Sequence, residues 1–269
     1  MRILFIGDIF GKPGRDILHK ALPSLVDLHG IDLVVANVEN SAAGFGVTGD
    51  IAETILGYGV DVMTSGNHIW DKKEILEYIP RQPKLLRPAN FPAGVPGRGT
   101  WVGKTRSGEP VAVVNVMGRI FMAPLDDPFA VVLREIEAVR ARARVIIVDF
   151  HAEATSEKAA MGWHLDGRVT AIFGTHTHVQ TADERLLPKG TAYLTDVGMT
   201  GPHDSIIGVA VEPALSRFVN GMPAKFEAAT GAARLKAIII TADPSTGKAL
   251  GIERLNLSAA EVAALAHHD

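Results

Sequence analysis

The sequence predicts an α/β protein that forms a single domain over residues 1–269. Apolar strand-like runs recur along the chain, and amphipathic segments with helical spacing separate several of them. No internal repeat and no linker-like low-complexity stretch interrupts this pattern. Several early runs are continuously apolar, which is typical of strands that are covered on both faces. From about residue 100 some strands follow one another without a helix, and there we expect an antiparallel portion.

The expected strands in chain order are Ile3–Ile6, Asp32–Ala36, Val60–Thr64, Val111–Val116, Val145–Val148, Val169–Phe173, Tyr193–Val197, Ile206–Val211 and Lys236–Thr241. The clearest helix is Phe129–Ala143, because its apolar residues recur at helical spacing between Arg and Glu residues. The apolar positions of this helix are Val132, Leu133, Ile136 and Val139.

Composition restricts the classes of function. An apolar content of 47% with 21% charged residues indicates an ordered globular protein. No run approaches the roughly 18 apolar residues of a membrane helix, and "MRILFIGDIFGKPG" is typical of a first strand, so we expect a cytoplasmic protein. The chain has no cysteine, so a metal site must use nitrogen and oxygen ligands. A net charge of −3 does not support a large nucleic-acid-binding surface.

Metal-capable or acid/base side chains follow five of the expected strands. In open α/β sheets, the loops at the carboxyl ends of the strands form the ligand site. A single Asp or Asn there is typical of a turn, so the coincidence of five strand ends is what indicates a site. The side chains that follow the five strands are Asp8, then Glu39 with Asn40, then Asn67 with His68, then His151, and last His176 with His178.

The remaining histidines are not counted as ligands. His19, His29, His267 and His268 are expected at the surface. His164 and His203 are expected in glycine-rich loops that border the site.

Seven candidate ligands are too many for one ion and suit two ions that share one bridging carboxylate, either Asp8 or Glu39. Nitrogen and oxygen donors without sulfur suit iron, manganese or zinc. Two ions ~3.5–4 Å apart can activate a hydroxide and clamp both oxygens of an in-line displacement at phosphorus. Since only two carboxylates face the ions, the site should stay electropositive and attract a phosphate ester. The seven candidates are Asp8, Glu39, Asn40, Asn67, His151, His176 and His178.

The order of these motifs resembles the calcineurin-like metallophosphoesterases, whose motifs run D-x-H, G-D, G-N-H-[DE], a lone His and G-H-x-H. The chain has Asp8, an acidic bridge, Gly66-Asn67-His68, His151 and finally "GTHTH". It departs from the pattern at Phe10, which replaces the histidine of D-x-H, and at Glu39, which replaces the bridging aspartate. These departures, with "GDIFGKPGR", "NSAAGFGVT" and "TDVGMTGPHDSIIG", are similar to the YmdB-type branch of 2′,3′-cyclic nucleotide phosphodiesterases.

The resemblance implies a sandwich of two packed mixed β-sheets flanked by helices (α/β/β/α). It also implies two divalent or trivalent transition-metal ions per chain, with iron preferred over manganese or zinc. By motif, the first ion is held by Asp8, Glu39, Asn40 and His178, and the second by Glu39, Asn67, His151 and His176. His68 is the expected general acid.

The expected partner is a small phosphodiester such as a 2′,3′-cyclic nucleotide, hydrolysed by a metal-activated hydroxide. RNA ends and a homo-oligomer stay open as further partners, no membrane is expected, and the substrate-binding residues are not assigned.

Three alternatives remain. An amidohydrolase also uses H-x-H with two metals, but it carries that motif on the first strand of a barrel, whereas here it comes after every other candidate ligand. A phosphomonoesterase on the same fold would use the same two-metal core. A regulatory protein whose binding role outweighs its hydrolysis is the third alternative.

Overall fold

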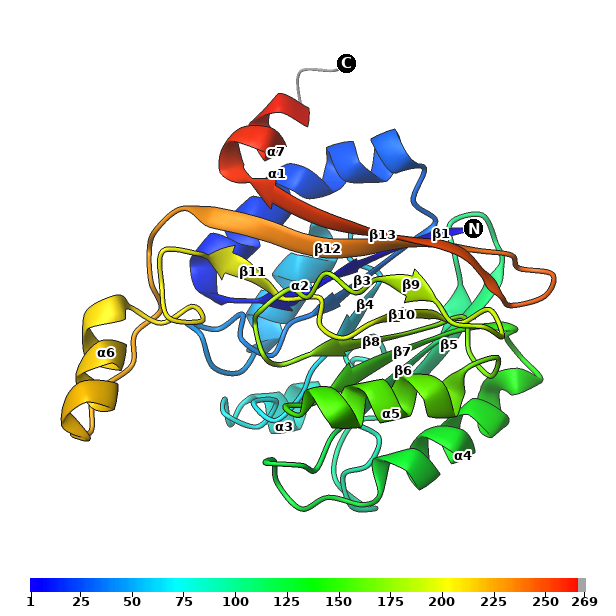
Figure 1. The fold of residues 1–269 in the computed structure, drawn as a ribbon, viewed down its shortest axis with the longest axis horizontal. Helices are drawn as coiled ribbons and strands as arrows, with labels where there is room; N and C mark the ends of the chain where they lie inside the picture. The colour runs from blue at the N-terminus through cyan, green and yellow to red at the C-terminus, as the bar shows by residue number, and fades with distance from the viewer. Residues whose placement is uncertain (266–269) are drawn as a thin grey trace.

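The computed structural model describes residues 1–265, so His267 and His268 lie outside the described residues. Two β-sheets pack face to face, and helices cover the outer face of each sheet (Figure 1). The predicted α/β/β/α sandwich of two mixed sheets is therefore confirmed.

The first sheet has seven strands within residues 1–265. Strand β1 is parallel to β3 and antiparallel to β12, while β3 and β4 are parallel. The order is β2 (Asp8–Ile9), β11 (Met199–Pro202), β12 (Ala233–Ala242), β1 (Arg2–Ile6), β3 (Leu33–Asn37) and β4 (Val62–Thr64), with β13 (Ala249–Ser258) paired to β12.

The second sheet has six strands in the described chain. Strands β6, β7, β8 and β10 run parallel, and β5 and β9 pair antiparallel at the two sides. The order is β5 (Thr100–Lys104), β6 (Pro110–Met117), β7 (Val145–His151), β8 (Ala171–Thr175), β10 (Ala192–Leu194) and β9 (Arg185–Leu186). The expected antiparallel portion after residue 100 is present in the β5–β6 and β12–β13 pairs.

The side chains of each strand alternate between two apolar layers, as the period of a strand requires. In β1, Ile3 and Phe5 face the second sheet, whereas Leu4 and Ile6 face the helices. The outer layer of the first sheet is covered by α1 (Gly11–His29), α2 (Gly49–Gly57), α3 (Ile75–Tyr78) and α7 (Ala259–Leu265). The outer layer of the second is covered by α4 (Pro128–Arg140), which matches the helix expected over Phe129–Ala143, and by α5 (Thr155–Leu165).

Two expectations about single segments are wrong. Ile206–Val211 is not a strand: Ile207 (φ 47°) and Gly208 (φ 104°) leave the extended region, and α6 (Val211–Asn220) begins at Val211. His164 lies in α5, where its ring packs against Phe129, and not in a loop beside the site. In both places the short apolar or glycine-containing stretch is compatible with more than one structure, and tertiary contacts decide.

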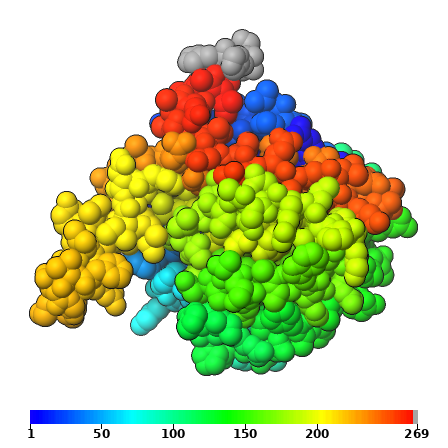
Figure 2. All heavy atoms as spheres, viewed as in Figure 1, coloured from blue at the N-terminus to red at the C-terminus, as the bar shows by residue number. Residues whose placement is uncertain are grey.

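Helix α6 extends away from the body of the molecule, as Figures 1 and 2 show. Of its side chains only Ala214 is buried, and Phe218 and Val219 are more than two-thirds exposed, at 78% and 72%. The helix therefore contributes little to the core. Within residues 1–265, no helix is both long enough and apolar enough to cross a membrane.

Candidate metal centre

All predicted site residues lie where the parallel strands of both sheets end. Asp8 follows β1, Glu39 and Asn40 follow β3, and Asn67 and His68 follow β4, all from the first sheet. His151 is the last residue of β7, and His176 and His178 follow β8, so these come from the second sheet. The carboxyl ends of the strands thus bring the two halves of the site together.

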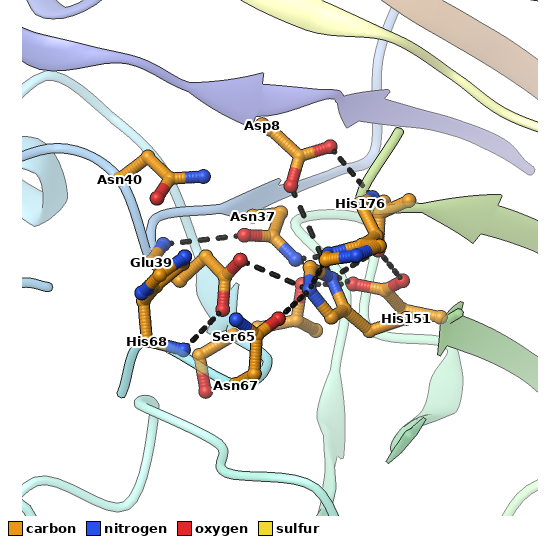
Figure 3. Close-up of polar contacts among 12 residues, drawn as sticks. Asp8, Asn37, Glu39, Asn40, Ser65, Asn67, His68, His151 and His176 are labelled. Carbon is orange, nitrogen blue, oxygen red and sulfur yellow. Dashed lines mark hydrogen bonds and ion pairs between the residues drawn. The ribbon is translucent and has the colours of Figure 1, made fainter. Parts of the chain in front are cut away.

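Three acceptor atoms surround Nε2 of His151 (Figure 3). Glu39 Oε1 and Asn67 Oδ1 each lie 2.9 Å from it, and His176 Nδ1 lies 3.1 Å away. One Nε2–H could satisfy one of the three acceptors at most. When Nε2 is unprotonated, its lone pair and those of the three acceptors converge in a buried place. A cation fits this place, because all four atoms can coordinate it at once. Three of these residues, Glu39, His151 and His176, also form a compact group of potential metal ligands.

A hydrogen-bonded chain fixes the tautomer of His151. Thr175 Oγ1 donates to Asp149 Oδ1 at 2.7 Å, and so it accepts from His151 Nδ1 at 2.9 Å. Asp149 is buried, and its other oxygen accepts from Thr64 Oγ1 and Asn37 Nδ2 at 2.5 and 3.2 Å. Nε2 of His151 is thereby left free to face the candidate ion.

The other two histidines have partners of the same kind. Nε2 of His176 lies 3.0 Å from a carboxylate oxygen of Glu153, which leaves Nδ1 facing His151. Nδ1 of His178 donates to the carbonyl of Ile207 at 2.8 Å, which leaves Nε2 facing Asn40. His176 and His178 thus each direct one unprotonated ring nitrogen into the site, beside Nε2 of His151.

Charges inside the site shift the pKa values strongly. Burial would raise the pKa of Glu39, but the adjacent His151 lowers it to about 2. Burial would lower the pKa of His151, but the Glu39 carboxylate raises it to about 9. Burial, and next His151, lowers the pKa of His176 to about 3. Without metal, a proton on His151 therefore balances the negative charge of Glu39. A bound cation would take over this role at the same place.

Asp8 is fully buried, and burial raises its pKa well above the usual range. Its Oδ2 accepts from the backbone N–H of His176 at 3.3 Å, whereas its Oδ1 has no hydrogen-bond partner. Since an unpaired buried carboxylate oxygen is costly, this atom also fits a cation site.

Phe10 fills the space beside His178, with ring centroids 5.6 Å apart. Asn40 Nδ2 lies 3.0 Å from Nε2 of His178, so the amide is next to the ring as expected. To act as an oxygen ligand, the amide of Asn40 has to rotate, because here its nitrogen faces the histidine.

His68 stands slightly apart from this group. Its backbone N–H donates to Glu39 Oε2 at 3.0 Å, and its Nδ1 lies 2.8 Å from Asp71 Oδ2. The imidazole is not among the atoms around His151, and its edge packs against Phe45 with ring centroids 5.3 Å apart. This position is consistent with a residue that contacts a substrate instead of an ion.

The loop after β8 is held in a strained conformation. His176 and His178 have φ values of 99° and 65°, a region that side-chain-bearing residues rarely adopt. The residue between them, Thr177, donates to Asp196 Oδ2 through its backbone N–H at 3.2 Å and its hydroxyl at 2.8 Å. The same oxygen accepts from the buried Lys158 at 2.6 Å. Asp196 therefore anchors the loop that carries two candidate ligands.

A cleft of about 270 Å³ opens onto the site. Glu39, Asn40, His68, His176 and His178 line one part of it, and the other part is apolar, formed by Phe10, Phe45, Ile207, Val209 and Phe226. A larger hollow of about 580 Å³ lies between α1 and α7, but none of the predicted site residues lines it.

Sequence reasoning missed the supporting residues Asp149, Thr175, Glu153 and Asp196. One signal was available for Asp149, because it is the single charged residue of the otherwise apolar run from Val145 to Phe150. The others are ordinary loop or strand residues whose role depends on contacts between elements.

Comparison with known proteins identifies relatives over almost the whole chain. The model of a family described as YmdB-like protein matches residues 4–255. A 2′,3′-cyclic-nucleotide 2′-phosphodiesterase of Bacillus subtilis (strain 168) is 50% identical over 95% of this chain and 96% of its own. A crystal structure of a hypothetical protein from Thermus thermophilus has a TM-score of 0.90 and 45% identity, covering 96% of this chain and 99% of its own. The crystal structure of a novel phosphatase from Mycoplasma pneumoniae has a TM-score of 0.90 and 36% identity, over 96% and 93%.

Proposed function

This chain belongs to the YmdB-like protein family, and on that premise we propose that it is a metal-dependent phosphodiesterase that hydrolyses 2′,3′-cyclic nucleotides. The observation that carries the proposal is the group of three acceptors around His151 Nε2, because a cation satisfies all of them together. The name of the Bacillus subtilis relative supports the substrate class.

We propose two ions with Glu39 as their shared ligand. Glu39 is buried, and its two oxygens face different neighbours, His151 and the His68 backbone. The first ion would be held by Asp8, Glu39, Asn40 and His178, and the second by Glu39, Asn67, His151 and His176. Nitrogen and oxygen donors of this kind suit iron, manganese or zinc, and the preference for iron rests on the family resemblance.

When bound, two ions lower the pKa of a water molecule and place positive charge beside the phosphoryl oxygens. The chain itself supplies the proton for the leaving group. As the water oxygen bonds to phosphorus and the P–O2′ bond breaks, His68 donates a proton to O2′, and a nucleoside 3′-phosphate results. Asp71 holds the His68 ring through Nδ1, so that Nε2 can carry this proton.

A panel of substrates tests the function. Metal-replete protein should hydrolyse 2′,3′-cAMP and bis-p-nitrophenyl phosphate, and p-nitrophenyl phosphate much more slowly. A chelator should abolish the activity, and metal analysis of freshly purified protein should give about two ions per chain. A preference for the monoester would identify a phosphomonoesterase. If metal-loaded protein hydrolysed none of the three substrates, the result would favour the regulatory alternative.

A further inference from the structure

A second pocket lies directly beside the metal cleft. It has a volume of about 330 Å³, and it shares two lining residues, His178 and Ile207, with the cleft. Lys236 from β12 and His203 from the loop after β11 also line it. No acidic residue is among its lining residues. A ligand in the cleft could therefore extend past Ile207 into this pocket.

Lys236 has no partner for its charge within residues 1–265. The residue is only 8% exposed, and its ammonium, which makes no ion pair in the described chain, is not fully enclosed and can reach the pocket. Lysine is almost never so buried unless it is paired. The other buried lysine, Lys158, follows this rule, because its ammonium lies 2.6 Å from Asp196. A buried lysine in an open pocket that lacks a carboxylate suits an anion from outside the chain.

Neighbouring charges also favour an anionic ligand in this pocket. Burial lowers the pKa of Lys236, and the charges of Arg234 and Arg254, which lie close enough to act on it, lower the pKa further. These two arginines already have partners, since Arg254 pairs with Glu184 at 3.1 Å and Arg234 lies 3.7 Å from Glu261. Burial also lowers the pKa of His203; its hydrogen bond to the Gly201 carbonyl opposes this shift, and the charge of Lys236 adds to it. Lys236 is therefore the free cation of the pocket in the described chain, and the arginines add positive potential around it.

We propose that this pocket binds a second phosphate of the substrate, the one on the 5′ side of the nucleotide whose cyclic phosphate lies in the metal cleft. This inference rests on the proposed function and makes its substrate class more specific: a short RNA that ends in a 2′,3′-cyclic phosphate. Such a ligand carries its next phosphate on the same ribose, so the two anions can occupy adjoining pockets. With a net charge of −3, the protein has little else to hold a long RNA, and recognition is confined to the terminal nucleotide and its 5′ neighbour.

The test compares two substrates, adenosine 2′,3′-cyclic phosphate with and without a 5′-phosphate, at fixed ionic strength and full metal loading. The ratio of their kcat/KM values should favour the 5′-phosphorylated substrate by roughly tenfold or more, as expected of a charge-assisted contact in a buried place. Lys236→Met should bring this ratio close to one, and Lys236→Arg should retain most of it. Lys248→Met is the matched control, because Lys248 is exposed on the turn between β12 and β13, and it should keep the wild-type ratio.

Several outcomes would overturn the subsite. A wild-type ratio near one would do so without any variant, and so would a Lys236→Met ratio equal to that of the wild type. If inorganic phosphate inhibits the wild type but not Lys236→Met while the ratio stays near one, the pocket binds free phosphate and not the substrate. If the wild type hydrolyses neither substrate, the proposed function itself fails, which is a different result from an unselective enzyme.

Discussion

The Glu39 carboxylate contacts two parts of the site at once. One oxygen faces Nε2 of His151, and the other accepts from the backbone N–H of His68. A residue in this position can link two ions and also hold the segment that carries the general acid. The site therefore depends on this residue for charge and for geometry.

We predict that Glu39→Ala loses both ions. Removal of the shared carboxylate takes one ligand from each ion and leaves His151 without its counter-charge. Metal content per chain, measured after dialysis, should fall from about two to near zero, whereas Glu53→Ala on the exposed side of α2 should keep both. One ion at full occupancy in Glu39→Ala would show that Glu39 does not bridge.

The contribution of His68 to kcat/KM should depend on the leaving group of the substrate. Positioned proton transfer contributes roughly 10²–10⁴-fold, and a ribose hydroxyl needs this help while p-nitrophenolate does not. His68→Ala should keep its metals and lose much more kcat/KM on 2′,3′-cAMP than on bis-p-nitrophenyl phosphate. Equal losses at matched metal content would indicate electrostatic stabilisation, and loss of metal would make His68 a ligand or its support.

At the scale of the element, the loop after β8 combines strain with anchoring. Two residues with positive φ cost on the order of 1–3 kcal/mol each, and Asp196 offsets that cost by holding Thr177 between them. Close packing helps the anchor: a Cβ at Gly174 would overlap the Thr195 carbonyl oxygen and lie 2.7 Å from the Lys158 side chain, so glycine leaves room for both. The loop is thus shaped before any ion binds.

We predict that Asp196→Asn weakens metal binding about 10- to 100-fold, the range seen when the support of a ligand is removed. The variant also leaves Lys158 buried and unpaired, which should cost about 3–5 kcal/mol of unfolding free energy. The double variant Asp196→Asn/Lys158→Met removes the unpaired charge and should regain much of that stability. Its metal affinity, measured by titration calorimetry, should stay low. If the metal affinity of the double variant recovered together with its stability, Asp196 would support only the fold and not the metal ligands.

The sequence was sufficient for the strands that carry the ligands, because each is a mainly apolar run that is followed by a polar residue. It was not sufficient for β13, whose side chains are mostly exposed or half-buried and include Glu253 and Arg254. The support of His151 could not be predicted either, because it depends on the register of two strands that places His151 opposite Thr175. Ile206–Val211 was assigned incorrectly because apolar composition does not reveal a positive φ.

At the scale of the whole molecule, the two sheets share one apolar layer. Phe5 of β1 and Phe173 of β8 meet across it, with ring centroids 4.2 Å apart. Since neither sheet can keep this face out of water alone, we propose that residues 1–269 form one domain.

The single domain can be tested by calorimetry. Metal-free protein should unfold in one transition, with equal calorimetric and van't Hoff enthalpies. Phe5→Ala should lower the unfolding free energy by about 3–5 kcal/mol and move the whole transition. Two transitions, of which Phe5→Ala moves only one, would mean that the sheets unfold separately.

The place of β1 in the first sheet has a consequence for the order in which the protein can be made. Strand β1 lies between β3, which follows it closely in the chain, and β12, which is made more than two hundred residues later. During synthesis on the ribosome, one side of β1 stays without its partner until residues 233–242 have left the exit tunnel. Because unpaired strands with apolar faces aggregate readily, the nascent chain is exposed to this risk for most of its translation. Asp8, which begins β2 just after β1, acquires its final place only when its partner strand β11 and then β12 arrive.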